Sequence, residues 1–230
     1  MTNLPLIQKL IHFVQPVFAG LEHWVGDWGL AVILFTVLVR ICLIPVSVRQ
    51  SDLAASQFIF SRKAAELQKS WTGTAEALAE EMAKLMRQQK FNPLALFMNA
   101  IIQSPILITV YTIFSQLGPA AHSILVPWVS SIGVPDPSAM IPVAVALTSG
   151  LTTMVTLIPG EFMQTGSVKF SFVLITGISL LILWTAPVAT ALYYGTSSVW
   201  GALERKILSR RVRRRILEQL GPEANGEASP

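Results

Sequence analysis

The sequence predicts an all-α integral membrane protein with five transmembrane helices, an N-terminal interfacial helix and a cytoplasmic helical hairpin. Of its 230 residues, 52% are hydrophobic and 13% are charged, whereas soluble domains carry about 25% charged residues. The mean hydropathy is +0.56. A water-soluble fold of this length could not hide so much apolar side chain in its core, so a bilayer protein is the economical interpretation.

Positive charge is segregated along the chain, and the segregation predicts the orientation in the membrane. All but three of the 17 Lys and Arg residues lie between Arg49 and Lys90 or between Arg205 and Arg215, and residues 118–137 contain none. Cytoplasmic segments of membrane proteins are enriched in these residues. Five crossings then place both basic blocks and the C-terminus in the cytoplasm and the N-terminus outside. This pattern favours membrane orientation over nucleic-acid binding as the cause of the net charge of +4.

Residues 1–24 are the first predicted element, an amphipathic helix at the external membrane surface. Apolar side chains such as Leu10 and Val14 alternate with polar ones such as His12 and Gln15. This spacing gives one apolar stripe and one polar face, as expected of a helix that lies in the interface. A spanning helix is the alternative, although its polar residues would be costly in the hydrocarbon core.

Residues 25–49 hold span one, and residues 50–92 then turn polar and charged. Two amphipathic helices fit the second stretch, at about 52–70 and 75–90, with Thr74 as the N-cap of the second. This segment is therefore predicted to form a helical hairpin in the cytoplasm.

Residues 93–208 supply spans two to five. The long apolar run near their end exceeds one crossing, and Thr185-Ala186-Pro187 is its natural break. Residues 209–230 are expected to be a basic cytoplasmic tail with a disordered end. The four spans are predicted at about residues 93–117, 139–158, 168–184 and 188–207.

Arg40 is a cation inside an apolar span. It lies about 18 Å along the helix from Trp28, at a rise of about 1.5 Å per residue. An arginine at such depth costs about 2.5–3.5 kcal/mol on insertion scales. Snorkelling to the headgroups is one explanation, but Arg49 marks that boundary about 13 Å further along. An intramembrane ion pair is another, yet no Asp or Glu occurs in residues 28–48, 93–117, 139–158 or 168–200.

Neutral polar side chains recur at helical spacing in the spans and predict a hydrated cavity around Arg40, open to the cytoplasm. Serine and threonine also join membrane helices, so each row alone is a weak signal. Together with an arginine that lacks a carboxylate, they indicate a substrate groove. Its predicted members besides Arg40 are Thr36, Ser47, Asn99, Gln103, Thr152, Thr156, Thr190, Tyr194 and Ser197.

A positive cavity without a fixed counter-ion favours a carboxylate ligand. A passing chain with a short acidic external tail could dock there while its apolar segment moves into lipid. The sequence has no P-loop, metal-ligand cluster or nucleophile–base pair, so we expect no enzyme activity, no cofactor and no small-molecule substrate. A small transporter or channel is the alternative, but the chain has no convincing internal repeat and no intramembrane acid. A passive assembly factor that shields helices is a third interpretation.

Several local motifs resemble the YidC family of membrane protein insertases, which includes the mitochondrial oxidase-assembly and chloroplast Albino proteins. The resemblance covers about residues 20–208, and the order and spacing of the motifs make it specific. The motifs are Trp28-Gly29-Leu30-Ala31, Val39-Arg40 with Pro45 and Gln50, Asn92-Pro93-Leu94, Gln103-Ser104-Pro105, Pro135-Asp136-Pro137, and Leu192-Tyr193-Tyr194 with Ser197-Ser198-Val199-Trp200.

The resemblance implies that Arg40 lies in a hydrophilic groove that is open to cytoplasm and lipid and closed outside. It implies nascent membrane proteins as substrates, the bilayer as the working surface, and the ribosome and the Sec translocon as further partners. No organelle transit peptide is visible in the sequence, which favours a bacterial plasma membrane as the location. The family's hairpin helps to recruit substrate. Its basic tails contact ribosomes, and anionic lipid is the alternative partner. The matching residues here are Arg210, Arg211, Arg213, Arg214 and Arg215.

The chain departs from the family pattern at several points. Its hairpin is shorter than in many members, and no Gly-Gly-Cys stretch follows Asn92-Pro93-Leu94. Ser104 stands where members often have Met, and Tyr194 where they usually have Trp. These departures suggest a specialised or second copy, so the range of clients is left open.

Overall fold

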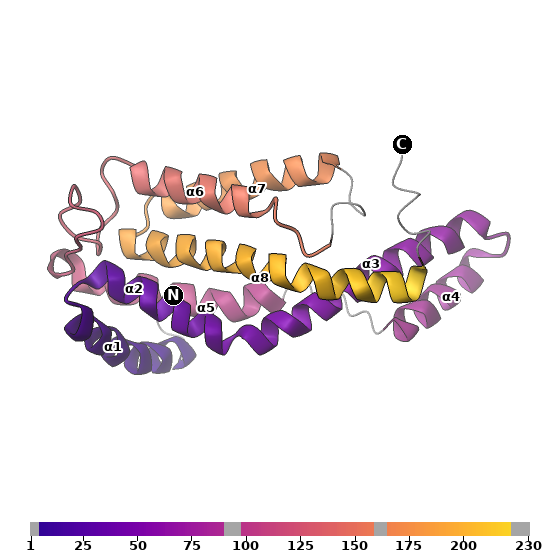
Figure 1. The fold of residues 1–230 in the computed structure, drawn as a ribbon, viewed down its shortest axis with the longest axis horizontal. Coiled ribbons are helices and arrows are strands. Elements are labelled where there is room, and N and C mark those ends of the chain that lie inside the picture. Colours follow the sequence, from indigo (N-terminus) through magenta and orange to yellow (C-terminus); the bar gives the residue numbers. More distant parts are fainter. Residues whose placement is uncertain (1–4, 90–97, 159–164, 222–230) are drawn as a thin grey trace. The chain divides into compact units, whose positions relative to one another are not determined.

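The computed structural model describes residues 5–89, 98–158 and 165–221, and within them the regular structure is helical (Figure 1). This confirms the all-α class. The helices are α1 (Pro5–Val25), α2 (Trp28–Cys42), α3 (Ile44–Ser70), α4 (Ala75–Gln88), α5 (Met98–Leu117), the short 3₁₀ helix η2 (Gly118–Ala120), α6 (Met140–Thr152), α7 (Thr165–Leu183) and α8 (Val188–Leu220).

The chain folds into two compact units, which we describe separately. The bundle unit comprises Met1–Ile44, Ala100–Val155 and Val168–Leu203. The charged unit comprises Pro45–Asn99, Thr156–Ser167 and Glu204–Pro230. Helix α8 therefore begins in the bundle unit and ends in the charged unit.

The helix boundaries follow local backbone chemistry. Helix α7 ends at Leu183 and α8 begins at Val188, so the predicted break around Pro187 is confirmed. Span one, expected over residues 25–49, is interrupted at Leu43, because Pro45 has no N–H to continue the α-helical ladder.

Helix α6 stops at Thr152, short of the predicted residue 158. The N–H groups of Thr153 and Met154 turn back to the carbonyls of Gly150 and Leu151, at 3.0 and 3.1 Å. These tighter turns close the helix early.

The described helices differ in length and apolarity. One segment, Ile101–Ala120, is by itself long and apolar enough to cross a bilayer, and α2 with α3 meets the same criteria as a bent pair. Met140–Thr152 and Lys169–Leu183 are shorter apolar helices. A helix needs about 20 apolar residues to span the hydrocarbon core. Five crossings therefore stay a prediction. The start of span two lies in residues 90–97, outside the described residues.

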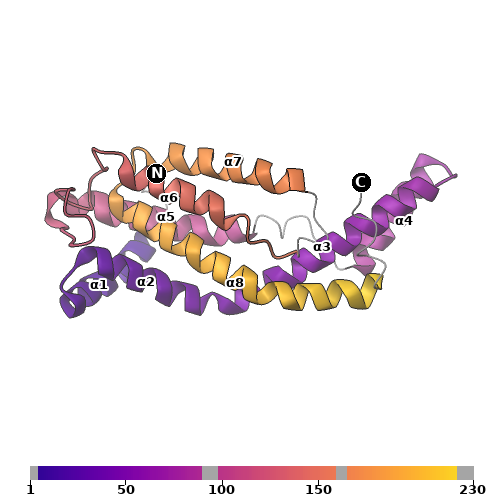
Figure 2. The same ribbon diagram turned by 45° about the horizontal axis from the view of Figure 1, so that its top comes forward.

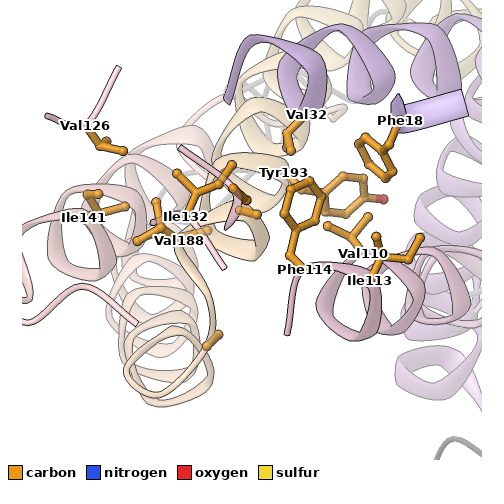
Figure 3. Packing of buried hydrophobic residues seen from close by; sticks show 14 of the residues in the cluster. Phe18, Val32, Val110, Ile113, Phe114, Val126, Ile132, Ile141, Val188 and Tyr193 are labelled. Carbon is orange, nitrogen blue, oxygen red and sulfur yellow. The ribbon is translucent and has the colours of Figure 1, made fainter. Parts of the chain in front are cut away.

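The core of the bundle unit is built from aromatic and β-branched side chains on α1, α2, α5 and α8. Phe18 packs on Phe35 with ring centroids 4.4 Å apart, and it meets Phe114 edge-on at 5.1 Å. Trp28 also meets Phe114 edge-on at 5.9 Å. Figure 3 shows Phe18, Phe114 and the ring of Tyr193 together in this cluster. Helix α1 is thus fastened to the bundle by its apolar stripe, and its predicted place in the interface stays a prediction.

Helix α8 is the centre of the bundle unit, and it lies between α6 and α2 in both views (Figures 1 and 2). A side chain at Gly195 would press on Val145 of α6, so the two helices approach closely there. A Cβ at Gly150 of α6 would collide with the Thr176 hydroxyl of α7. Small residues at such positions let membrane helices pack backbone against backbone.

The charged unit contains the rest of α3, helix α4 and the end of α8. Thr74 caps α4 by accepting a hydrogen bond from the Ala77 N–H at 3.3 Å. Ala55 and Ile59 of α3 form a buried cluster with Val212 and Ile216 of α8. The helix therefore continues through the basic stretch to Leu220 instead of ending near residue 207. The cause is that its apolar residues recur with helical period and have a surface to cover.

Candidate functional site

Arg40 is positioned by the last turn of α2, and its contacts join three helices of the bundle unit. Its Nε donates a hydrogen bond to Ser197 Oγ of α8 at 3.0 Å. Gln103 Nε2 of α5 lies 3.5 Å from the same oxygen. Tyr193, one helical turn before Ser197, is buried and interacts with both Ser197 and Arg40. We call Arg40, Gln103, Tyr193 and Ser197 the arginine cluster.

The partners of Arg40 are neutral. Among the described residues, no carboxylate lies within ion-pair distance of its guanidinium, and the bond to Ser197 engages only the Nε–H. Arg40 as a residue is half-buried on the apolar bundle. Its two terminal nitrogens form the forked edge that binds carboxylates in two parallel hydrogen bonds. This arrangement can hold an acidic group while one serine fixes the angle of the fork.

The other faces of α8 make separate helix–helix contacts. Tyr194 Oη lies 3.0 Å from Ser179 Oγ of α7, and Ser198 Oγ lies 3.1 Å from Ser149 Oγ of α6. These hydroxyl pairs fasten neighbouring helices, which is the ordinary role of such residues in a membrane bundle. Tyr194, which the sequence assigned to the groove, thus contacts α7, whereas Ser197 contacts Arg40.

Three further predicted groove residues are bonded within their own helices or have no partner. Thr36 is fully buried and donates to the Val32 carbonyl at 2.7 Å. Thr152 is half-buried and donates to the Ser149 carbonyl at 2.7 Å. Thr190 is 2% exposed, and its hydroxyl finds no hydrogen-bond partner among the described residues. The side chain of Asn99 lies outside the described residues.

Ser47 and Thr156 belong to the charged unit. Ser47 Oγ donates to a carboxylate oxygen of Glu204 at 3.0 Å. Thr156 Oγ1 donates to the Ile158 carbonyl at 2.6 Å. Both hydroxyls therefore have partners inside that unit.

Two arginines in the basic stretch of α8 contact Asp52 of α3. Arg211 makes a bidentate ion pair with Asp52 of α3, at 2.9 and 3.0 Å, and Arg215 contacts both the carboxylate and the carbonyl of Asp52, at 3.5 and 3.3 Å. Arg210, Arg213 and Arg214 are exposed. Asp52 was not among the predicted site residues, although it is the single acid between Arg49 and Arg62.

The loop at residues 118–137 has its own polar framework, built on two buried carboxylates. Asp27 and Asp136 are 4% and 5% exposed. Burial alone would raise the pKa of the Asp136 carboxyl. Hydrogen bonds from the Ile141 N–H, from the hydroxyl and N–H of Ser138, and from Trp128 outweigh it and hold this pKa below its usual value. Asp136 thereby fixes the start of α6.

A family model described as "60Kd inner membrane protein" matches residues 20–215, which include the arginine cluster and the whole basic stretch. The chain belongs to this family. It is the YidC, oxidase-assembly and Albino family, so the predicted resemblance is confirmed, and its YidC homologues are inner membrane proteins.

Curated relatives are similar over most of the chain. The membrane protein insertases YidC of Francisella tularensis subsp. novicida (strain U112) and of Francisella tularensis subsp. tularensis (strain SCHU S4) are each 26% identical to it over 204 residues. The match covers 87% of this chain and 36% of each relative, so the chain spans little more than a third of their length.

Proposed function

We propose that this YidC-family protein inserts other membrane proteins into the bilayer and that Arg40 is the docking point for acidic segments of its clients. The observation that carries the proposal is the half-buried Arg40, whose guanidinium is held by the neutral Ser197, with no carboxylate within ion-pair distance among the described residues. The names of the relatives, membrane protein insertase, agree with this function.

Electrostatics explain why such an arginine is useful. A guanidinium in a low-dielectric environment interacts with a carboxylate more strongly than it does in water. It also costs free energy to keep there without a counter-ion. A bound client carboxylate offsets the free-energy cost of the unpaired guanidinium, and the cost returns when the client leaves. We propose that the client is attracted to Arg40 but stays there only transiently, as an insertion site requires.

The physical task of an insertase is to help a short polar tail to cross the hydrocarbon core. We propose that Arg40 lies in a hydrophilic groove open to the cytoplasm and to lipid, so that the tail has less hydrocarbon to cross. The client's apolar segment leaves sideways into the bilayer because lipid solvates it well. No external energy source is needed, because the groove lowers the barrier for the polar tail and lipid solvates the apolar segment.

The topology that fits this task has the N-terminus outside and the C-terminus in the cytoplasm, with five crossings. The segregation of Lys and Arg supports it. We propose nascent membrane proteins as substrates and the bilayer as their destination. Exposed arginines at the end of α8, Arg210 and Arg214 among them, suit a polyanionic partner such as the ribosome. The Sec translocon is a further proposed partner.

The test uses purified protein in liposomes and two single-span clients that differ only in a short external tail, acidic in one and amide-substituted in the other. Arg40→Ala should reduce insertion of the acidic client about tenfold or more, because hydrogen bonds to charged groups contribute about 1.5–3 kcal/mol. The neutral client should insert as before. Lys169→Ala removes an exposed cation from the same unit and is the matched control.

Equal insertion of both clients by the Arg40→Ala variant would refute the role of the charge. Failure of the unaltered protein to insert either client would refute the insertase function itself. Solute uptake by the same liposomes would point instead to a transporter.

A further inference from the structure

Asp27 joins two parts of the bundle unit that are far apart in sequence. One carboxylate oxygen accepts the Leu30 N–H at 2.8 Å and so caps the N-terminus of α2. The same oxygen accepts the Ser123 hydroxyl at 3.0 Å, and the other oxygen accepts the Ile124 N–H at 2.7 Å. An N-cap needs only one such bond. The remaining bonds hold the loop at residues 118–137.

The backbone around Asp27 is shaped for this contact. Gly26 has a positive φ of 72°, a conformation that glycine adopts without strain, and it forms the corner between α1 and α2. A Cβ at Gly29 would collide with the Ser123 hydroxyl. The loop therefore approaches the first turn of α2 so closely that position 29 has no space for a side chain.

The same loop is bonded to itself beside the end of α5, and it is also bonded to the start of α8. Ser131 Oγ lies within hydrogen-bonding distance of the carbonyls of Gly118 and Ala121, just after α5. The first two N–H groups of α8, from Val188 and Ala189, donate to loop carbonyls at 3.0 and 2.9 Å. Such N–H groups have no partner within a helix. The loop thus ties α2, α5 and α8 together.

The inner side of this loop is apolar. Val126, Val129 and Ile132 are buried in the main core of the bundle unit. Figure 3 shows Val126 and Ile132 with Val188 and Ile141 in this part of the core. These three loop side chains join the loop to the core, whereas Ile124 and Trp128 of the same loop are 74% and 50% exposed.

We propose that Asp27 is a positioning residue that holds loop 118–137 across the outer end of the bundle as a seal against ions. The inference rests on the proposed function, because that function and its topology place the loop outside and admit water from the cytoplasmic side. A hydrated groove open on one side leaks unless the opposite end is closed. Asp27 is the tie that joins the loop to α2.

The test measures proton leak in liposomes that contain the purified full chain, with a pH-sensitive dye inside and a potassium diffusion potential applied. Asp27→Asn should increase the leak about tenfold, which corresponds to about 1.4 kcal/mol in the equilibrium that opens the loop. Gly29→Ala should also increase it, because the new Cβ displaces Ser123 while the carboxylate remains. The second variant keeps the proposal testable if Asp27→Asn folds poorly.

Asp136→Asn is the matched control. It removes another buried loop carboxylate, but the bonds of Asp136 go to Trp128 of the same loop, to Ser138 just after it and to Ile141 of the helix that directly follows, so Asp136 does not join the loop to α2. Leak should stay at the basal level in this variant. Equal leak from the Asp136 and Asp27 variants would mean general loosening and would overturn the proposal. So would basal leak in both the Asp27→Asn and Gly29→Ala proteins.

A labelling experiment separates this inference from the proposed function. A cysteine at the exposed Ser130, in a chain with Cys42→Ser, should react with an impermeant reagent from outside intact cells. Reaction only from the cytoplasmic side would overturn the outer seal even if insertion proceeds. The remaining case is an unaltered protein that fails to insert clients while the Asp27, Gly29 and Asp136 variants leak as expected above. That result would refute the proposed function and leave Asp27 as the residue that holds the loop.

Discussion

Two arginines in this protein have opposite environments, and each belongs to a different unit. Arg40 is half-buried on the apolar bundle and bonds to the uncharged Ser197. Arg211 is 57% exposed at its side chain and has a bidentate carboxylate partner in Asp52. A chain selected only for stability would place the carboxylate where the unpaired charge is more costly. An arginine without a carboxylate partner costs free energy in an apolar bundle, and the proposed docking of a client carboxylate would offset that cost.

The most direct test of the difference between Arg40 and Arg211 is to give Arg40 a carboxylate partner as well. Ser197→Asp should neutralise the guanidinium inside the bundle unit. Insertion of the acidic client should then fall about tenfold or more, since the client would have to displace an internal ion pair. Ser197→Asn, which is uncharged and similar in size to Asp, should retain most of the activity. Both variants are assayed in liposomes with the two matched clients.

Unchanged activity in the Ser197→Asp protein would show that Arg40 need not be unpaired. The melting temperature of the purified variant provides the internal check, because the new ion pair should not lower it. If the Ser197→Asp protein loses both activity and folding, its activity says nothing about the charge. The Ser197→Asn protein is then compared with the unaltered protein instead.

The sequence was sufficient to find Arg40 but not to choose its partner. The sequence alone shows the apolar run around Arg40 and the lack of acidic residues in the predicted spans. Ser197, Thr36 and Thr152 look equivalent in the sequence, because a hydroxyl at helical spacing can bond to another helix or back to its own. Thr36 bonds to the Val32 carbonyl of its own helix, whereas Ser197 accepts a hydrogen bond from Arg40 on another helix. Only tertiary packing decides between these outcomes.

Charge partners in the other unit were equally hidden. Asp52 reads as one acid in a mixed polar stretch, and its pairing with Arg211 spans 159 positions in the sequence. The continuation of α8 could have been read, because Val212, Ile216 and Leu220 recur every four residues. The arginines between these residues led instead to the prediction of a basic tail at residues 209–230. The predicted break at Thr185-Ala186-Pro187, by contrast, depends on proline chemistry alone and needs no tertiary knowledge.

Thr190 tests whether a buried hydroxyl in the bundle unit is functional. It is 2% exposed and its hydroxyl has no hydrogen-bond partner among the described residues. Thr190→Val keeps the shape and removes the unsatisfied group, so the free energy of unfolding should rise by about 1 kcal/mol. Insertion of both clients should be unchanged. Lower insertion by a stable Thr190→Val protein would return this residue to the substrate groove, where the sequence analysis placed it.

The smallest expected effect concerns the ion pair between Arg211 and Asp52. A double-mutant cycle with Asp52→Asn and Arg211→Gln, followed by unfolding in detergent, should give a coupling free energy of about 0.5–1 kcal/mol. The value is modest because water screens the exposed Arg211 side chain, and it should fall further at high salt. Lys84 and Glu81 form an exposed pair within α4 and provide the control cycle. Their coupling should be no larger.

Insertion of the acidic client should be insensitive to Asp52→Asn, whereas it should fall about tenfold or more in the Ser197→Asp protein. This difference in effect would separate the proposed functional role of Arg40 from the structural role of Arg211. If Asp52→Asn reduced insertion as strongly as Ser197→Asp, the two guanidinium groups would not differ in role. The charge at the end of α8 would then have to be counted with Arg40 as part of the path that the client follows.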